Sequence, residues 1–325
     1  MKKEWFVMLG KRKELFEKLN QVIDQATNKC FYFVTKPSNQ MKHMDFSHDK
    51  DGVWEEFCRG QISYFKQIDN DSDFELVDLI SADERKKAIY VLDDYVNEFS
   101  NLVEIIRNVE KLLDNYANKE FDDLKLMVTR FDTLEKTNSL LTFKIIYPVQ
   151  TIYKKNSISW NKGYKKNKNN LFRIPQNFEF FIYENKLYII DIDRFEKLYM
   201  EELEAFRIRE ARSTLKFIKE NNFLSEKTCT QLETYLFNNV KLVKQFLKAK
   251  DRLRSASKTV NEIHVVNYLK DGFSGYDLVN EYNEIEINSI RKAKSFIKIL
   301  GDEIFVSRLT GNTYNVKASN LVQNS

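Results

Sequence analysis

The scarcity of glycine and proline is the feature that most restricts how this chain can fold. The 325 residues include only 8 glycines and 3 prolines. A sandwich of short strands needs many tight turns, and a glycine-dependent nucleotide fold needs glycines beside the phosphates, so both are disfavoured. Because 42% of the residues are hydrophobic, the chain can still bury a sizeable core. The sequence therefore predicts a globular, helix-rich α+β protein.

Short β-hairpins are expected in the C-terminal half. Aromatic and β-branched residues form two runs, 178–183 and 187–192, around a turn at 184–186. A second pair of runs, 303–309 and 313–317, flanks a Thr-Gly-Asn turn. Further strands are predicted at 30–35, 74–80 and 140–149, the last at a sheet edge because it contains a proline. Helices are predicted at 15–26, 54–68, 81–116, 121–134, 194–221, 226–257 and 284–300.

The predicted helix over 81–116 has the most regular pattern. It opens with a capping box, Ser81 and Glu84, and continues with apolar residues spaced alternately by three and four. These are Ile89, Leu92, Val96, Phe99, Val103, Ile106 and Leu113. Such a seam is typical of a helix that pairs with a second copy, whereas Tyr95 and Leu102 widen the stripe and favour packing inside one subunit. Both alternatives stay open, and a homodimer is one of them.

Charge is distributed very unevenly along the chain. Residues 1–135 hold 20 Lys and Arg against 27 Asp and Glu, whereas residues 136–325 hold 32 against 21. The segment from Lys136 to Phe178 contains no carboxylate, although the average composition would place about six there. The contrast predicts an acidic scaffold or docking region over 1–135 and a basic binding region over 136–325.

The segment without carboxylates, 136–178, carries nine Lys and Arg, and aromatic residues stand among them near its end. Cations beside flat aromatic faces suit a phosphate backbone with exposed bases. The pattern therefore predicts DNA or RNA as a partner. The predicted contacts are Lys154, Lys155, Trp160, Lys162, Tyr164, Lys165, Lys166, Lys168 and Arg173.

Two further basic groups recur at helical spacing. The first comprises Lys241, Lys244, Lys248 and Arg252, on one side of the predicted helix 226–257. The second comprises Arg291, Lys294 and Lys298, on the last predicted helix. Each group could meet several phosphates together, and a hairpin after the last helix gives the outline of a winged-helix reader. A charged outer face is also usual for any amphipathic helix, so this alternative stays open.

A metal-dependent nuclease is the main enzymatic alternative. Glu184 and Lys186 form an E-x-K triplet, and Glu179, Asp191 and Asp193 are close in sequence. The triplet falls at a hairpin turn, however, and the two aspartates precede a helix that they could cap. The chain has no paired-cysteine zinc pattern or phosphate-binding loop, and no cofactor or metal is predicted. The sequence favours a binding protein over an enzyme.

The cellular compartment of the protein is predicted from the lengths of its apolar runs and from its cysteines. No run is long enough for a signal peptide or a membrane-spanning helix, which predicts a cytoplasmic protein. Cys30, Cys58 and Cys229 have no paired spacing and are predicted to be reduced core thiols. The many Lys, Asn, Ile and Phe residues are typical of an AT-rich bacterial genome.

Several segments of the C-terminal half share a pattern with a known family. They include Phe-Arg-Ile at 172–174, the hydrophobic run 178–190, Phe-Glu-Lys at 195–197, and the ending 297–312. Over about 140–320 the chain resembles the KwaB-like family, the soluble component of the bacterial Kiwa antiphage system; residues 1–135 show no such match.

The resemblance implies a DNA-binding dimer that works beside a membrane-protein partner and blocks phage replication or transcription. The alternatives of a metal-dependent nuclease and of a protein-interaction subunit in a defence complex stay open. The latter would use the basic half to meet an acidic protein or anionic lipid.

Overall fold

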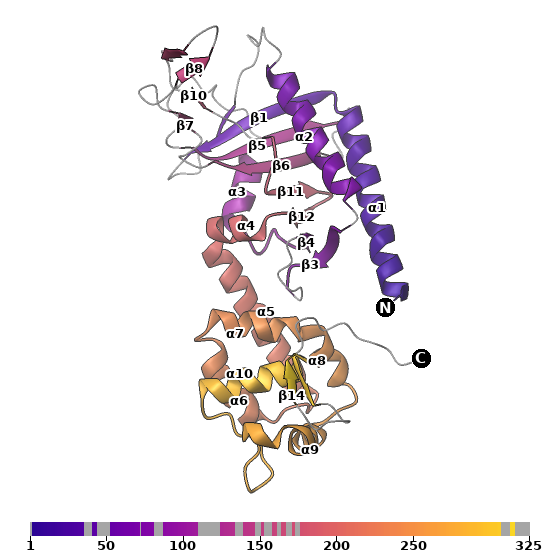
Figure 1. The fold of residues 1–325 in the computed structure, drawn as a ribbon, viewed down its shortest axis with the longest axis vertical. Helices are drawn as coiled ribbons and strands as arrows, with labels where there is room; N and C mark the ends of the chain where they lie inside the picture. The colour runs from indigo at the N-terminus through magenta and orange to yellow at the C-terminus, as the bar shows by residue number, and fades with distance from the viewer. Residues whose placement is uncertain are drawn as a thin grey trace. The chain divides into compact units, whose positions relative to one another are not determined.

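A β-sheet with its covering helices and a bundle of helices form the two units of the chain (Figure 1). In the computed structural model, residues 2–77 and 84–200 make the sheet unit, and residues 78–83 and 201–325 make the helical unit. The structure describes residues 2–35, 41–43, 53–71, 73–80, 87–109, 124–133, 139–146, 151–152, 158–160, 164–166, 171–172, 176–306 and 313–315. The predicted helix-rich α+β class is confirmed, although the strands are not confined to the C-terminal half.

Eight strands of the sheet unit hydrogen-bond in the order β2-β1-β5-β6-β11-β12-β4-β3. The pairs with a described register are all antiparallel. The strands are β1 Asn28–Thr35, β2 Met41–His43, β3 Glu75–Asp78, β4 Ala88–Leu92, β5 Leu124–Asp132, β6 Ser139–Ile145, β11 Phe180–Tyr183 and β12 Lys186–Ile189. The predicted hairpin around 184–186 is therefore confirmed as β11 and β12. The predicted strand at 140–149 is confirmed over 139–145 as β6, which pairs on both sides. The sheet edge predicted at its end, at Pro148, lies outside the described residues.

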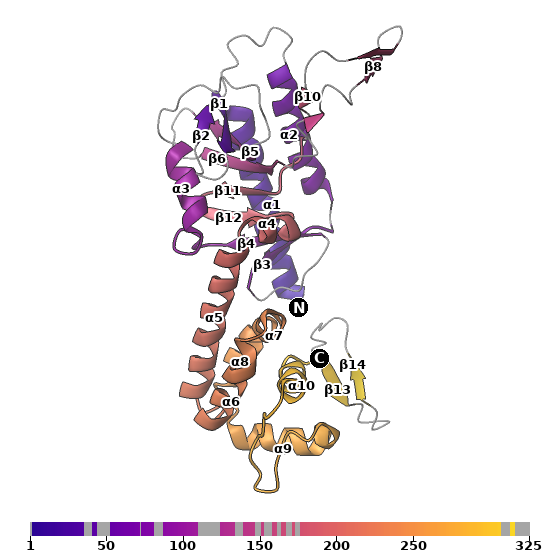
Figure 2. The same ribbon diagram turned by 90° about the vertical axis from the view of Figure 1, so that its left-hand side faces the viewer.

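Alternating side chains give the sheet two apolar faces. Helices α1 (Lys2–Gln25) and α2 (Val53–Asn70) cover one face, where their buried residues pack against Phe33 and Phe181. On the other face, the rings of Phe143 and Phe180 stack with centroids 4.6 Å apart. Helices α3 (Ser100–Val109) and α4 (Ile192–Leu198) lie on that side, and Figure 2 shows the strands between α3 and α1. The sheet is consequently buried on both sides.

Two stretches predicted to be helical in the first half are strands, although residues 100–109 of the predicted helix 81–116 are helical as α3. Residues 88–92 form β4, where Leu92 lies opposite Leu187 of β12. Residues 124–132 form β5, between β1 and β6. Both runs are rich in β-branched and aromatic residues, and cross-strand pairing outweighs their helix-like spacing. The apolar residues of the predicted helix 81–116 are divided between β4, a turn and α3, so the described residues do not form one continuous helix. The homodimer stays a prediction.

The change of charge near residue 136 does not coincide with a boundary between units. Strands β5 and β6, on either side of it, pair along their whole length, from Leu126 with Ile145 to Asp132 with Ser139. Separate roles for the acidic residues 1–135 and the basic residues 136–325 stay a prediction.

The helical unit has more helices than predicted. The range 226–257 holds three, because Asn239 begins a new helix by accepting a hydrogen bond from the Leu242 amide at 3.2 Å. Its helices are α5 Met200–Glu220, α6 Glu226–Leu236, α7 Val240–Lys248, α8 Lys250–Ala256, α9 Glu262–Phe273 and α10 Ile290–Leu300, with Met200 belonging to the sheet unit. The final hairpin is confirmed as β13 (Ile304–Val306) paired with β14 (Thr313–Asn315).

All three cysteines are free thiols. Burial raises the pKa of Cys58 to about 11 and that of Cys229 to about 12. Both thiols are therefore protonated at neutral pH and unreactive, whereas Cys30 is only half-buried. Over the described residues of the chain, no helix is long and apolar enough to cross a bilayer.

Candidate nucleic-acid interface

The segment without carboxylates, 136–178, contains two short antiparallel ladders after β6. Strand β7 (Thr151–Ile152) pairs with β10 (Leu171–Phe172), and β8 (Ile158–Trp160) pairs with β9 (Tyr164–Lys166). Only the backbone of Trp160, Tyr164, Lys165 and Lys166 is described. The other predicted contacts here lie outside the described residues; they are Lys154, Lys155, Lys162, Lys168 and Arg173. Their role stays a prediction.

Helix α7 carries most of the first basic group. Its inner side is buried through Leu242, Val243, Phe246 and Leu247. The lysines consequently face outward. Lys241 is exposed, and Lys244 and Lys248 are half-buried. The expected amphipathic placement of these lysines is confirmed, while their contact with phosphate stays a prediction.

Arg252 belongs to a different helix from the α7 lysines, so its predicted place on the same helix is wrong. The backbone breaks at Ala249, and Arg252 lies on α8. Its Nη1 donates to the Gly301 carbonyl oxygen at 2.5 Å and to Asp302 Oδ2 at 3.3 Å. Gly301 ends α10, and a cation is favourable beside the terminal carbonyls of a helix. Arg252 thus joins α8 to the end of α10.

Helix α10 presents the second basic group. Ser289 begins the helix by accepting a hydrogen bond from the Lys292 amide at 3.3 Å. Its inner side is buried through Ala293, Phe296 and Ile297. Arg291 and Lys294 are exposed on the outer side, and Lys298, a turn further along, is half-buried.

Lys292 lies beside the second basic group but is held inside the unit. Its Nζ lies 3.0 Å from Asp277 Oδ2 and 3.1 Å from Glu286 Oε2. Burial lowers the pKa of Lys292, but the hydrogen bonds to these two carboxylates outweigh it and the pKa is raised. Lys292 is therefore a charged packing residue.

The two basic groups lie on neighbouring helices. Helices α7 and α10 pack against each other through a core that includes Phe246 and Phe296, and Figure 1 shows them side by side. Exposed cations at fixed spacing on a rigid pair of helices can neutralise several phosphates of one polyanion.

The E-x-K triplet does not form a site. Glu184 and Asn185 make the hairpin tip with φ of 48° and 57°, the left-handed region usual for a two-residue turn. Glu184 pairs with Lys18 at 3.6 Å, whereas Lys186 pairs with Asp93 at 2.9 Å. The carboxylate and the lysine therefore engage different partners. No group of three or more metal-binding side chains occurs within the described residues.

Glu179 is the buried centre of a charged network in the sheet unit. Its Oε1 accepts from Lys144 Nζ and from Arg194 Nη1, both at 2.7 Å, and its Oε2 accepts from the Ile145 amide at 2.7 Å. Asp191 accepts from the Arg194 amide, so its predicted capping role is confirmed. The one sign of this network in the sequence is Lys144, a lone charge in an apolar strand.

We expect the double substitution Glu184→Ala with Lys186→Ala to leave phage protection near wild type. Each side chain makes an exposed ion pair, which contributes little to stability. The measurement is a phage-protection assay beside a magnesium-dependent cleavage assay. A folded double variant that loses both protection and a wild-type cleavage activity would establish the nuclease instead.

Comparison with known families confirms the resemblance and places its start earlier, within residues 1–135, for which the sequence pattern indicated no match. Residues 121–310 match the family model described as Kiwa protein KwaB-like. No curated protein and no solved structure matches the chain. The matched range includes β5, β6, the β11–β12 hairpin and both basic helices. The chain therefore belongs to the Kiwa protein KwaB-like family.

Proposed function

We propose that this protein acts in antiphage defence by binding DNA through basic surfaces of its C-terminal half. Membership of the family supports the defence role. The observation that carries the DNA-binding role is the pair of outward-facing basic groups on α7 and α10. Binding would block phage replication or transcription, in the cytoplasm and together with a membrane or other partner protein.

Contact through phosphates is the mode that these groups support. Lys241, Arg291 and Lys294 are exposed and stand on helices fixed by a buried core. Each phosphate that a cation neutralises releases counterions, so affinity rises with the number of contacts and falls with salt. The segment 136–178 would add cations and stacking aromatic residues. The expected binding is strong at low salt and only weakly dependent on sequence.

Binding without catalysis agrees with the positions of the acidic residues. Glu179 is enclosed by two cations and an amide, and Glu184 and Lys186 engage separate partners. A nuclease needs carboxylates that converge on a metal and a nucleophile. These side chains have structural contacts in place of that arrangement.

The proposal predicts that removing three exposed cations weakens DNA binding. The variant is Lys241→Ala, Arg291→Ala and Lys294→Ala together. If each cation meets one phosphate, the slope of log affinity against log salt falls by about three, and affinity at low salt drops by at least about tenfold. Fluorescence anisotropy with a labelled duplex measures both quantities.

A control variant removes equal charge from other exposed positions, through Lys13→Ala, Lys66→Ala and Lys258→Ala. Its slope and affinity should stay close to wild type. Equal losses in both variants would mean that net charge alone governs binding, and an unchanged slope in the first variant would exclude the α7 and α10 surface.

A further inference from the structure

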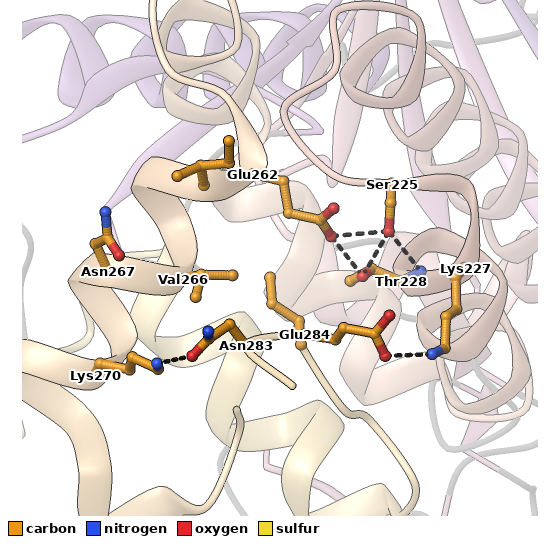
Figure 3. A pocket seen from close by; sticks show the side chains of 11 residues that line it. Ser225, Lys227, Thr228, Glu262, Val266, Asn267, Lys270, Asn283 and Glu284 are labelled. Carbon is orange, nitrogen blue, oxygen red and sulfur yellow. Dashed lines mark hydrogen bonds and ion pairs between the residues drawn. The ribbon is translucent and has the colours of Figure 1, made fainter. Parts of the chain in front are cut away.

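A cavity of about 460 Å³ lies within the helical unit, and none of the predicted DNA contacts lines it (Figure 3). It is open to solvent on one side and is lined by the beginning of α6, by α9 and by the loop before α10. Small-molecule sites usually measure ~300 to ~1,000 Å³. The cavity is therefore large enough for a compact organic ligand.

Polar contacts tie the walls of the cavity together. Glu262 Oε1 on α9 accepts from Ser225 Oγ at 2.9 Å and from Thr228 Oγ1 at 2.6 Å, both at the beginning of α6. Lys227 of α6 donates to Glu284 Oε2 in the loop at 2.6 Å. This hydrogen bond lowers the pKa of Glu284, which stays ionised at neutral pH. The cavity thus has a built-in polar frame.

The charges of this frame disfavour an anionic ligand. Two lysines line the cavity, but Lys227 is paired with Glu284, and Lys270 donates to the Asn283 side-chain oxygen. Two carboxylates stand in the same lining and would repel a phosphate. A neutral ligand with its own hydrogen-bonding groups fits this balance best.

Asn267 gives the cavity a free hydrogen-bonding group. It lies on α9, lines the cavity and is exposed to solvent, so its amide is available to a ligand (Figure 3). A carboxamide offers a donor and an acceptor side by side in one plane. The neighbouring Ile263 and Val266 on the same helix supply apolar surface. Together these groups suit a flat ring with a donor and an acceptor on its edge.

We propose that this cavity binds a neutral nucleobase, with Asn267 at its hydrogen-bonding edge and Ile263 and Val266 against its face. Adenine matches this site, because its adjacent amino group and ring nitrogen complement an asparagine amide. The proposal goes beyond DNA binding through phosphates. The base could belong to a free nucleoside or to a nucleic-acid strand, and the chemistry of recognition is the same.

Calorimetric titration of the full chain with adenosine tests the site. Wild type should bind, and Asn267→Ala should weaken binding at least about tenfold, as expected for loss of a bidentate contact. Ile263→Trp should block the cavity, and because Ile263 is 69% exposed this change should not disturb folding. Asn288→Ala, on the exposed chain before α10, is the matched control and should bind as wild type.

A single-stranded oligonucleotide with 2-aminopurine in place of one adenine separates the two sources. A fluorescence change that disappears in Asn267→Ala assigns the site to a base within a strand, whereas adenosine binding without that change assigns it to a free nucleoside. No binding by either probe, or equal binding by wild type, Asn267→Ala and Ile263→Trp, would overturn the proposal. Adenosine binding in a protein that does not bind duplex DNA would support this site and reject the proposed function.

Discussion

Replacing Glu179 with glutamine is expected to lower the free energy of unfolding by about 3–5 kcal/mol, the usual cost of breaking a buried ion pair. Glu179 is 1% exposed and Lys144 is 3% exposed, so the lysine would be left buried and charged without its counterion. The Ile145 amide would lose a charged acceptor as well. Urea denaturation followed by circular dichroism measures the change.

Glu184→Gln is the matched control, because it makes the same chemical change at the exposed hairpin tip of the same unit. It should alter stability by no more than about 0.5 kcal/mol. The double substitution Glu179→Gln with Lys144→Met should recover much of the loss, since it removes the unpaired buried ammonium while the glutamine oxygen still accepts from the Ile145 amide. A loss below about 1 kcal/mol in Glu179→Gln would contradict the structural role assigned to this network.

Charge reversal in the basic segment should have the largest effect on DNA binding. Lys165, Lys166 and Lys168 lie in a stretch without carboxylates, and changing all three to glutamate replaces attraction to phosphate with repulsion. The variant should lose at least ~1,000-fold in affinity at low salt, because three contacts disappear and three negative charges are added. Electrophoretic mobility shift with a labelled duplex would measure this loss.

The fold of this variant should be unaffected, since we predict these lysines to be surface residues, and surface charges contribute little to stability. An unchanged unfolding midpoint is therefore the internal control. If affinity and salt slope both match wild type, the segment 136–178 has no role in binding, and the surface on α7 and α10 must account for it alone.

Local signals in the sequence were enough for the β11–β12 hairpin and for helices α1 and α2. The hairpin has two β-branched and aromatic runs around a turn, so its pairing depends on nearby residues. Helices α1 and α2 each have one apolar stripe, because both pack against the same face of the sheet.

Strands β4 and β5 could not be predicted in the same way. Each has one partner distant in sequence: β4 pairs with β12, and β5 pairs with β1. A strand with both faces buried loses the polar alternation that distinguishes it from a helix. The local spacing of apolar residues then predicts a helix, and the pairing with strands distant in sequence determines that the segment is a strand.

The basic groups were only partly predictable. The spacing of Lys241, Lys244 and Lys248 indicated one outer face, which the buried side of α7 confirms. Arg252 has the same spacing in the sequence, but the helix breaks at Ala249. Arg252 therefore lies on α8, where it donates to the Gly301 carbonyl oxygen at the end of α10. The cavity around Asn267 gave no signal, because its lining comes from three separate segments.

The most direct test of the proposed DNA binding is a titration of the full chain with duplex DNA at several salt concentrations, repeated with an acidic protein and with anionic lipid vesicles as competitors. The proposal predicts tight binding near about 50 mM salt, weakening by at least about 40-fold near about 200 mM if three or more phosphates are contacted, and little displacement by either competitor. Absence of DNA binding at the lowest salt, or complete displacement by the acidic protein or the vesicles, would contradict it.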